Sequence, residues 1–342
     1  MTDPAQVAPV LDALVEPALL LDRAGRVALA NPAARDVLGA WIVGQPHMAV
    51  LRQPALVSPV EDALAGGIEG RARITHSSGA VEAAYEVRIT PLDGTVLLVF
   101  RDLTEAQAGA SQRRDFVANV SHELKTPLTA IAGFIETLQG PARDDPAARG
   151  RFLAMMAQEV ARMDRLVSDL LSLSRLEGQA RRRPTDRLDL AALASEAAGL
   201  LRPGAEAEGV RIALDLPEAA PVQGDRDQLM QVLSNLIENA VKYGARPGRV
   251  TLTLQPVARE PVLRARAWRL EVADDGPGIA PEHVPRLTER FYRVDTGRSR
   301  AQGGTGLGLS IVKHIVNRHR GRLRIESAPG EGTRVSVILP AA

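Results

Sequence analysis

Three patterns of apolar and polar positions follow one another along the chain. Up to about residue 105, short apolar runs alternate with turns rich in glycine and proline, a pattern typical of strands. Strands are predicted at 18–22, 27–30, 72–75, 84–90 and 95–100. Asn31 followed by Pro32 predicts a capped helix start, because asparagine favours the cap and proline the first helical position. Residues 1–105 are therefore expected to form a small α/β module.

The second pattern, over residues 106–180, is helical. One apolar stripe recurs every three or four residues and comprises Phe116, Val120, Leu124, Pro127, Ile131, Phe134 and Leu138. After a break at Gly140-Pro141, a second stripe has the 3.5-residue period of a packed bundle and comprises Met156, Val160, Met163, Val167 and Leu170. Two helices cannot bury two such stripes alone, so we expect a homodimer that forms a four-helix bundle.

The third pattern is that of an α/β domain over residues 185–342. Helices are expected at 190–202, 226–243 and 306–319, and strands at 209–214, 249–255, 268–274, 322–327 and 333–339. The basic break 181–184 is expected to be a solvated linker. The polar stretch 280–302 has little periodicity, which is typical of a lid or an irregular loop.

Composition excludes several classes of function. A net charge of +1 argues against a nucleic-acid-binding surface as the main function. The absence of cysteine excludes disulfides and zinc–thiolate sites. No run of 18 apolar residues occurs, and the apolar stretch 10–21 is broken by Asp12, Glu16 and Pro17. We therefore expect a cytoplasmic protein without a membrane span.

The helix predicted to carry the first apolar stripe has one histidine, His122. It lies on the side of the helix opposite the stripe. A lone surface histidine is most often only a solvated side chain. Here Glu123 follows directly and could accept a proton from the ring. Pro127 interrupts the backbone hydrogen bonds five residues later. A zinc-protease helix would need a second histidine at position 126, where the chain has Thr126.

The eight residues from Ser121 to Leu128, Ser-His-Glu-Leu-Lys-Thr-Pro-Leu, resemble the phosphoacceptor box of sensor histidine kinases. The resemblance implies that His122 accepts a phosphoryl group from ATP. It also implies that Glu123 acts as base and that Thr126 assists dephosphorylation of a partner protein.

Four further motifs in the third region fit one ligand. Asn235, Asn239 and Lys242 fall on one helical face, which suits a hydrated Mg²⁺ and a polyphosphate. An apolar strand ends at Asp274-Asp275-Gly276-Pro277-Gly278-Ile279, where a carboxylate could accept the amine of adenine. A glycine loop, 303–310, opens a helix and is a candidate anion site. The fourth motif, 330–333, precedes the last strand. Each is common by itself, as a polar helix face, a turn or a hairpin.

In this order, the four motifs resemble the N, G1, G2 and G3 boxes of the histidine-kinase catalytic domain, and Phe291-Tyr292-Arg293 resembles its F box. The resemblance implies ATP and Mg²⁺ as cofactors, with Asn235 and Asn239 as metal ligands and Asp274 as the residue that reads adenine. It places the following residues around the nucleotide: Lys242, Tyr243, Gly276, Gly278, Ile279, Arg293, Gly304, Thr305, Gly306, Leu307 and Gly308. The family usually has asparagine where Asp275 stands.

Two other readings compete with a kinase. Gyrase, a heat-shock chaperone and a mismatch-repair protein share this catalytic domain and hydrolyse ATP, but they carry a glutamate at the position of Asn235 to activate water. A signalling scaffold without chemistry would not need the complete set of motifs. Neither a Walker A lysine loop nor a His-Arg-Asp catalytic loop occurs, so the common NTPase and serine/threonine kinase plans are absent.

Taken whole, the chain resembles a two-component sensor histidine kinase of the phosphate-regulon branch, partly through the stretch 286–295. The first module resembles a PAS domain, including the exit Asp102-Leu103-Thr104, with a plain dimerisation or spacer module as the alternative. The implied fold is α+β and multidomain: a PAS-like module, a dimeric helical hairpin and a GHKL-type α/β sandwich. The implied function is autophosphorylation of His122, transfer to an aspartate of a response-regulator receiver domain, and phosphatase action on it, in phosphate-responsive signalling.

Overall fold

A computed structural model of the chain describes residues 4–78, 81–178, 183–261, 263–294 and 304–342. They fall into two units, Met1–Ala118 and Asn119–Ala342. Parts of three expectations lie outside the described residues: the linker 181–184, the polar stretch 280–302 and the glycine loop from Gly303. No described helix has the length and apolar character needed to cross a bilayer.

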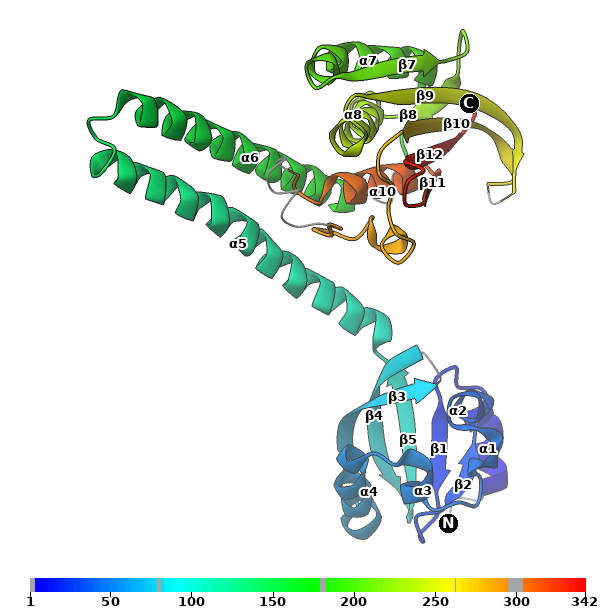
Figure 1. Ribbon diagram of the computed structural model, residues 1–342. Coiled ribbons are helices and arrows are strands. Elements are labelled where there is room, and N and C mark those ends of the chain that lie inside the picture. The colour runs from blue at the N-terminus through cyan, green and yellow to red at the C-terminus, as the bar shows by residue number, and fades with distance from the viewer. Residues whose placement is uncertain (1–3, 79–80, 179–182, 262, 295–303) are drawn as a thin grey trace. The chain divides into compact units, whose positions relative to one another are not determined.

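The first unit is built on one antiparallel five-stranded sheet with the order β2-β1-β5-β4-β3 (Figure 1). Its strands are β1 (Ala18–Leu21), β2 (Val27–Ala30), β3 (Gly70–Ser78), β4 (Val81–Leu92) and β5 (Thr95–Asp102). Its helices are α1 (Pro4–Asp12), α2 (Pro32–Leu38), η1 (Ala40–Ile42), α3 (His47–Leu51) and α4 (Pro54–Gly66). Apolar residues of the central strands and of α4, among them Leu98, Phe100, Leu56 and Val60, form one buried cluster.

All five predicted strands of this unit are present, and β3 and β4 are longer than expected. Their hairpin continues beyond the predicted bounds through polar positions such as His76, Ser77 and Glu82, where no apolar alternation marks a strand. Asn31 caps α2 as predicted, since its side chain accepts a hydrogen bond from the Ala34 N–H. The helix α4 was not predicted, because Pro54 and Pro59 obscure its apolar period.

Two long helices follow, α5 (Thr104–Gln139) and α6 (Pro146–Gly178). They match the predicted helical hairpin, and α5 continues through Pro127. Near the hairpin connection, the rings of Phe134 and Phe152 lie 5.5 Å apart. The large apolar side chains that α6 buries most completely are Leu166, Leu173 and Leu176, which lie beside the predicted stripe rather than on it. Two of them, Leu166 and Leu176, belong to the core cluster of the α/β part that follows.

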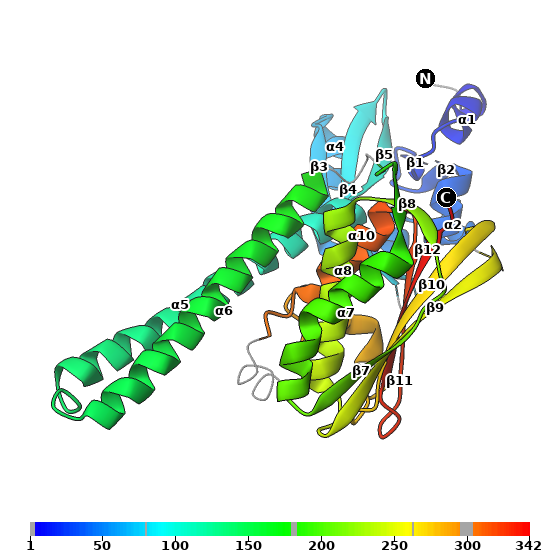
Figure 2. The same ribbon diagram turned by 90° about the horizontal axis from the view of Figure 1, so that it is seen from above.

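The α/β part has helices on one face of a five-stranded sheet with the order β11-β12-β10-β9-β7 (Figures 1 and 2). Only β7 and β9 pair in parallel. The strands of this sheet are β7 (Val210–Asp215), β9 (Gly248–Glu260), β10 (Ala265–Asp274), β11 (Arg322–Ser327) and β12 (Thr333–Pro340). The helices are α7 (Leu190–Ala207), α8 (Arg226–Tyr243), η2 (Val284–Arg286) and α10 (Gly308–Arg318).

The prediction is closest where amphipathic periodicity is strongest. The helix α8 and the strand β11 have the predicted bounds. The helix α7 extends beyond the predicted end at 202 and contains Pro203, and its last turn is anchored by Ala205, which is 2% exposed. A separate two-stranded sheet of β6 (Asp186–Asp189) and β8 (Pro221–Gly224) was not predicted, because four residues with aspartate, proline and glycine carry little strand signal.

Candidate functional site

His122 is solvent-exposed on α5, as its position on the helical wheel predicted. Thr126, one turn later, is exposed on the same helix, and its Oγ1 donates a hydrogen bond to the His122 carbonyl oxygen at 3.1 Å. Such a bond to the preceding turn holds the hydroxyl close to its own helix. The ring and the hydroxyl therefore stand on one accessible face, while Pro127 next to them is buried.

Glu123, the predicted base, points away from this face. Its Oε2 accepts a hydrogen bond from Arg162 Nη2 on α6 at 2.8 Å. The Nη1 of Arg293, in the F-box motif, lies 3.9 Å from the same oxygen. The side chains of Glu123, Arg162 and Arg293 are 18%, 10% and 6% exposed. This carboxylate therefore joins both helices of the hairpin to the α/β part, and in the described residues its hydrogen bond goes to Arg162 and not to His122.

The helix α8 carries the N-box residues. Its apolar face is buried against α7, α10 and the sheet, and its first turn is capped by Asp225, which accepts a bond from the Gln228 N–H at 3.2 Å. Asn235, Asn239 and Lys242 lie half-buried along another face of the same helix. The packing of the apolar face thus fixes where the two amides and the ammonium group stand.

Lys242 has an unusual charge environment. Burial first, and then the neighbouring cations Arg293 and Arg165, lower its pKa from 10.5 to about 8. Its Nζ lies 5.1 Å from the centre of the Tyr243 ring. Such an excess of buried positive charge is stabilised when an anion binds next to it.

The glycine loop reaches these residues of α8. A side-chain carbon added at Gly304 would lie 2.8 Å from Lys242 Nζ and 3.0 Å from the Tyr243 hydroxyl. One added at Gly308, the first residue of α10, would lie 3.2 Å from Asn235 Oδ1. The structure thus brings the predicted N and G2 boxes together, about 65 positions apart in the sequence, and the glycines let the loop pass close to the side chains of α8.

Three hydrogen bonds fix the loop. The Phe291 N–H donates to the Gly306 carbonyl oxygen at 2.9 Å, which links the F box to the loop. Thr305 Oγ1 donates to Asp169 Oδ2 of α6 at 2.8 Å and accepts a bond from the Leu307 N–H at 3.2 Å. Leu307 itself is fully buried in the core cluster. One hydroxyl of the predicted nucleotide loop is therefore held by the helical hairpin.

The G1 and G3 motifs meet at Asp274. Its Oδ1 accepts bonds from the Gly276 N–H at 2.9 Å and the Thr333 N–H at 3.3 Å. Burial raises the pKa of this carboxyl. Gly278 has φ +69°, and a side chain there would collide with the Ala328 backbone. Ile279 is held by a bond from its N–H to Ser327 Oγ at 2.9 Å. Within the described residues, the bonds from Gly276 and Thr333 both go to Oδ1 of Asp274, so Oδ2 can accept a donor such as an amine.

These residues fit Mg²⁺ and a polyphosphate. The Nδ2 of Asn235 is buried and has no hydrogen-bond partner within the described residues, so the site has an unused polar atom. Rotating the amide by a half-turn exchanges its nitrogen and oxygen. The nitrogen could then donate to a phosphate oxygen, or the oxygen could bind a metal ion. With Asn239 and Lys242 alongside, the set supplies two amides and one cation.

Two residues of this site were missed from the sequence. Arg162 and Asp169 lie on α6 and contact Glu123 and Thr305. Arg162 is only 8% exposed, which is rare for arginine unless it is paired. Its place four residues before Leu166, on the inward side of α6, is the only sequence signal that could have indicated burial.

Known families match all three regions of the chain. The family described as PAS fold matches residues 11–108, the His Kinase A (phospho-acceptor) domain matches 112–179, and the histidine kinase-, DNA gyrase B- and HSP90-like ATPase family matches 224–342.

Curated relatives give the same assignment. The phosphate regulon sensor protein PhoR of Pseudomonas aeruginosa is 42% identical over 248 residues, which are 69% of this chain and 52% of the relative. The sensor-like histidine kinase SenX3 of Mycolicibacterium smegmatis is 39% identical over 241 residues, 70% of this chain and 60% of the relative. The chain thus spans little more than half the length of these relatives.

Solved structures share the fold. The histidine kinase AdeS of Acinetobacter baumannii is similar with a TM-score of 0.50 and 27% identity, over 64% of this chain and 97% of that one. The histidine kinase ThkA, in a complex with the response regulator protein TrrA, is similar with a TM-score of 0.53 and 21% identity, over 97% of this chain and 98% of that one. With the three matched domains in this order, the chain belongs to the sensor histidine kinases.

Proposed function

We propose that the chain transfers the γ-phosphoryl group of Mg-ATP to His122. The observation that carries the proposal is the pairing of an exposed histidine on α5 with a cluster of Asn235, Asn239 and Lys242 under a glycine loop in the same unit. Phosphoryl transfer depends mainly on positioning and on neutralising charge. The cluster supplies charge, and the helix supplies a nucleophile that is open to solvent.

In this reaction, an unprotonated ring nitrogen of His122 forms a bond to the γ-phosphorus while the bond to the β,γ-bridging oxygen breaks. ADP leaves with that electron pair. The proton on the other ring nitrogen passes to Glu123 or to solvent, and for Glu123 to take it the carboxylate must first leave Arg162. Asn235 and Asn239 would hold the metal, which neutralises phosphate charge. Lys242, Arg293 and Thr305 would contact the phosphates, and Asp274 the adenine.

The second step we propose is transfer from His122 to an aspartate of a response-regulator receiver domain. The exposed face of His122 and Thr126 supports this, because a partner protein can reach both groups. Thr126 would orient a water molecule for hydrolysis of the receiver's phosphoaspartate. The relative named as a phosphate regulon sensor leads us to propose phosphate-responsive signalling for this chain.

A homodimer is the proposed assembly, with residues 1–105 as sensing module, 106–180 as dimerisation and phosphotransfer domain and 185–342 as catalytic domain. Large apolar side chains remain open to solvent on both helices at seven-residue spacing. Leu153, Val160 and Val167 of α6 are 53%, 56% and 44% exposed, and Leu128 and Ile135 of α5 are 60% and 40% exposed. A heptad row of this kind is the seam of a helical bundle.

Labelling with γ-³²P-ATP tests the reaction. We expect label that is lost in acid and survives alkali, as for a phosphorylated imidazole, and no label in His122→Ala or Asn239→Ala. His76→Ala, in the first unit, is the matched control and should label normally. Label that persists in His122→Ala would place the acceptor elsewhere.

Thr126→Ala separates the two proposed roles of the histidine face. It leaves the nucleophile in place, so autophosphorylation should continue while dephosphorylation of a receiver slows. A variant that folds normally but no longer labels would contradict this division. An ATPase that activates water is the alternative function, and it predicts release of phosphate without label on His122.

A further inference from the structure

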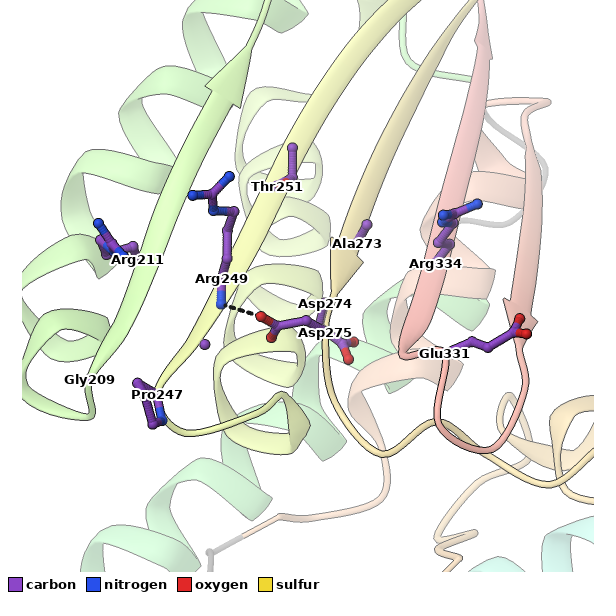
Figure 3. A pocket seen from close by; sticks show the side chains of 11 residues that line it. Gly209, Arg211, Pro247, Arg249, Thr251, Ala273, Asp274, Asp275, Glu331 and Arg334 are labelled. Atoms are coloured by element: carbon purple, nitrogen blue, oxygen red, sulfur yellow. Dashed lines mark hydrogen bonds between the residues drawn. The ribbon is translucent and has the colours of Figure 1, made fainter.

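A hollow lies on the sheet face opposite the helices. Its volume is about 510 Å³, and it is lined by Gly209, Arg211, Pro247, Gly248, Arg249, Thr251, Ala273, Asp274, Asp275, Glu331 and Arg334. Figure 3 shows these side chains in front of the sheet, with the helices behind it. Of the predicted nucleotide residues, only Asp274 belongs to it. The hollow is therefore separate from the cluster of Asn235, Asn239 and Lys242.

Small residues create the hollow. Thr251 of β9 pairs with Ala273 of β10, which pairs with Arg334 of β12. Successive side chains of a strand point to opposite faces, and the neighbours Val250, Leu252 and Val272 are buried on the helix side. The open face thus has a floor of short side chains at Thr251 and Ala273, with long side chains around it.

The long side chains are arginines from three strands. Arg211 of β7 is the direct register partner of Arg249 of β9. Arg334 stands across the floor from them, beyond Thr251 and Ala273 (Figure 3). All three are exposed, and within the described residues none of their side chains forms an ion pair. Like charges directly opposite each other on neighbouring strands are destabilising, so this arrangement is expected where an anion offsets the repulsion.

The carboxylates of the lining lie along one side and are partly engaged. Asp275 Oδ2 accepts a bond from the backbone N–H of Arg249 at 2.9 Å. Asp274 Oδ1 accepts bonds from two other backbone N–H groups. Glu331 lies in the turn before β12, near Arg334 in the view of Figure 3. These acids do not form ion pairs with Arg211 or Arg249 within the described part of the chain, so the guanidinium groups remain available.

We propose that this hollow binds a compact multivalent oxyanion, with Arg211, Arg249 and Arg334 as its ligands. Guanidinium groups bind phosphate and carboxylate in pairs of parallel hydrogen bonds. The volume lies within the range of about 300–1,000 Å³ that small-molecule sites occupy. The inference does not rest on the proposed phosphotransfer, since binding can be measured without ATP.

Calorimetric titration of the full chain with pyrophosphate and with citrate, in metal-free buffer, tests the proposal and separates phosphate from carboxylate ligands. Binding of at least one is expected. Arg211→Gln, Arg249→Gln and Arg334→Gln should each weaken it about tenfold, the loss expected when a charged hydrogen bond is removed. Thr251→Tyr, which fills the floor and leaves every arginine, should also weaken it.

Two variants serve as controls. Arg269→Gln removes an exposed arginine from β10 of the same sheet outside the hollow and should bind as the unaltered chain does. Lys242→Gln removes the cation of the nucleotide cluster and serves as a background in which the hollow is measured alone, and there the three arginine substitutions should still weaken binding. An arginine series without effect in that background would place the anion in the nucleotide cluster, and an equal loss in Arg269→Gln would show unspecific attraction. If neither pyrophosphate nor citrate binds, the proposal is wrong.

Discussion

Raising the pH above 8 should weaken nucleotide binding through a single group, Lys242. Its Nζ is half-buried beside Arg293 and Arg165, and burial followed by these cations lowers its pKa to about 8. A bound polyphosphate adds negative charge next to the ammonium group and raises its pKa again. The complex therefore binds a proton that the free protein has lost above pH 8.

Linkage gives the size of the effect. For one proton taken up on binding, the affinity falls about tenfold per pH unit between the free and the bound pKa. Between pH 8 and 9.5, the Kd for a non-hydrolysable ATP analogue should rise by at least about tenfold. Phosphate groups themselves titrate near pH 6, below this range.

Fluorescence or calorimetric titrations at half-unit steps from pH 7 to 9.5 would measure it. Lys242→Arg remains charged throughout and should show a flat profile, while Lys242→Met should bind weakly and also without this slope. A flat profile in the unaltered chain, or a slope that persists in Lys242→Arg, would refute the assignment.

The same titration has the opposite sign for folding. The folded pKa of Lys242 is depressed below its ordinary 10.5. Between about pH 8 and that value, the unfolded chain binds more protons, so this group alone makes the free energy of unfolding rise with pH. If the nucleotide affinity falls with rising pH while the free energy of unfolding does not fall, the loss of affinity comes from Lys242 and not from a general loss of structure.

Three further predictions concern contacts that the fold brings together. Asp169→Asn replaces the charged acceptor of the Thr305 hydroxyl, 2.8 Å away, by a weaker neutral one. Because the hydroxyl is then released more easily toward the phosphates, ATP should bind up to about tenfold more tightly in an equilibrium titration, with Asp164→Asn on the same helix as the control. Weaker binding in Asp169→Asn would show instead that Asp169 supports the nucleotide loop. His319 is fully buried, with Nδ1 bonded to the Ile315 carbonyl oxygen and Nε2 accepting the Asp225 N–H, and burial lowers its pKa from 6.5. As pH falls, the unfolded chain takes up the proton before the folded chain does, so the melting temperature of the catalytic part should fall below about pH 6.5. His319→Gln should lose this pH dependence, although the variant is less stable at pH 8. A pH dependence that the substitution leaves unchanged would contradict the assignment to His319. Asn31 makes four hydrogen bonds, to the Ala18 and Ala34 N–H groups and to the carbonyl oxygens of Leu14 and Glu16, so Asn31→Ala should cost about 2–4 kcal/mol. Urea unfolding followed by the fluorescence of Trp41, in a Trp268→Phe background, measures this free energy in the first unit. Asn31→Asp keeps the two accepted bonds, so its stability should lie between those of the unaltered chain and Asn31→Ala. A loss of stability below about 0.5 kcal/mol in Asn31→Ala would show that water replaces these bonds.

The sequence by itself determined the elements whose apolar faces repeat regularly. The predicted bounds of α8 and β11 agree with the structure, and the wheel placed His122 on an exposed face. The reason is that helical and strand periods are local: which side of an element is apolar depends on residues within two or three turns. The glycines at 304 and 308 could likewise be recognised as a loop that passes close to other groups, because glycine is common where the backbone approaches a neighbour closely.

Only the tertiary structure decided which partner each charged group has. Glu123 meets Arg162 across 39 positions, Asp225 meets His319 across 94, and Asp169 meets Thr305 across 136. The hollow between Arg249 and Arg334 likewise exists only when β9, β10 and β12 are in register. Polar side chains carry no period that names a distant partner, and the docking of whole elements through their apolar faces sets these distances.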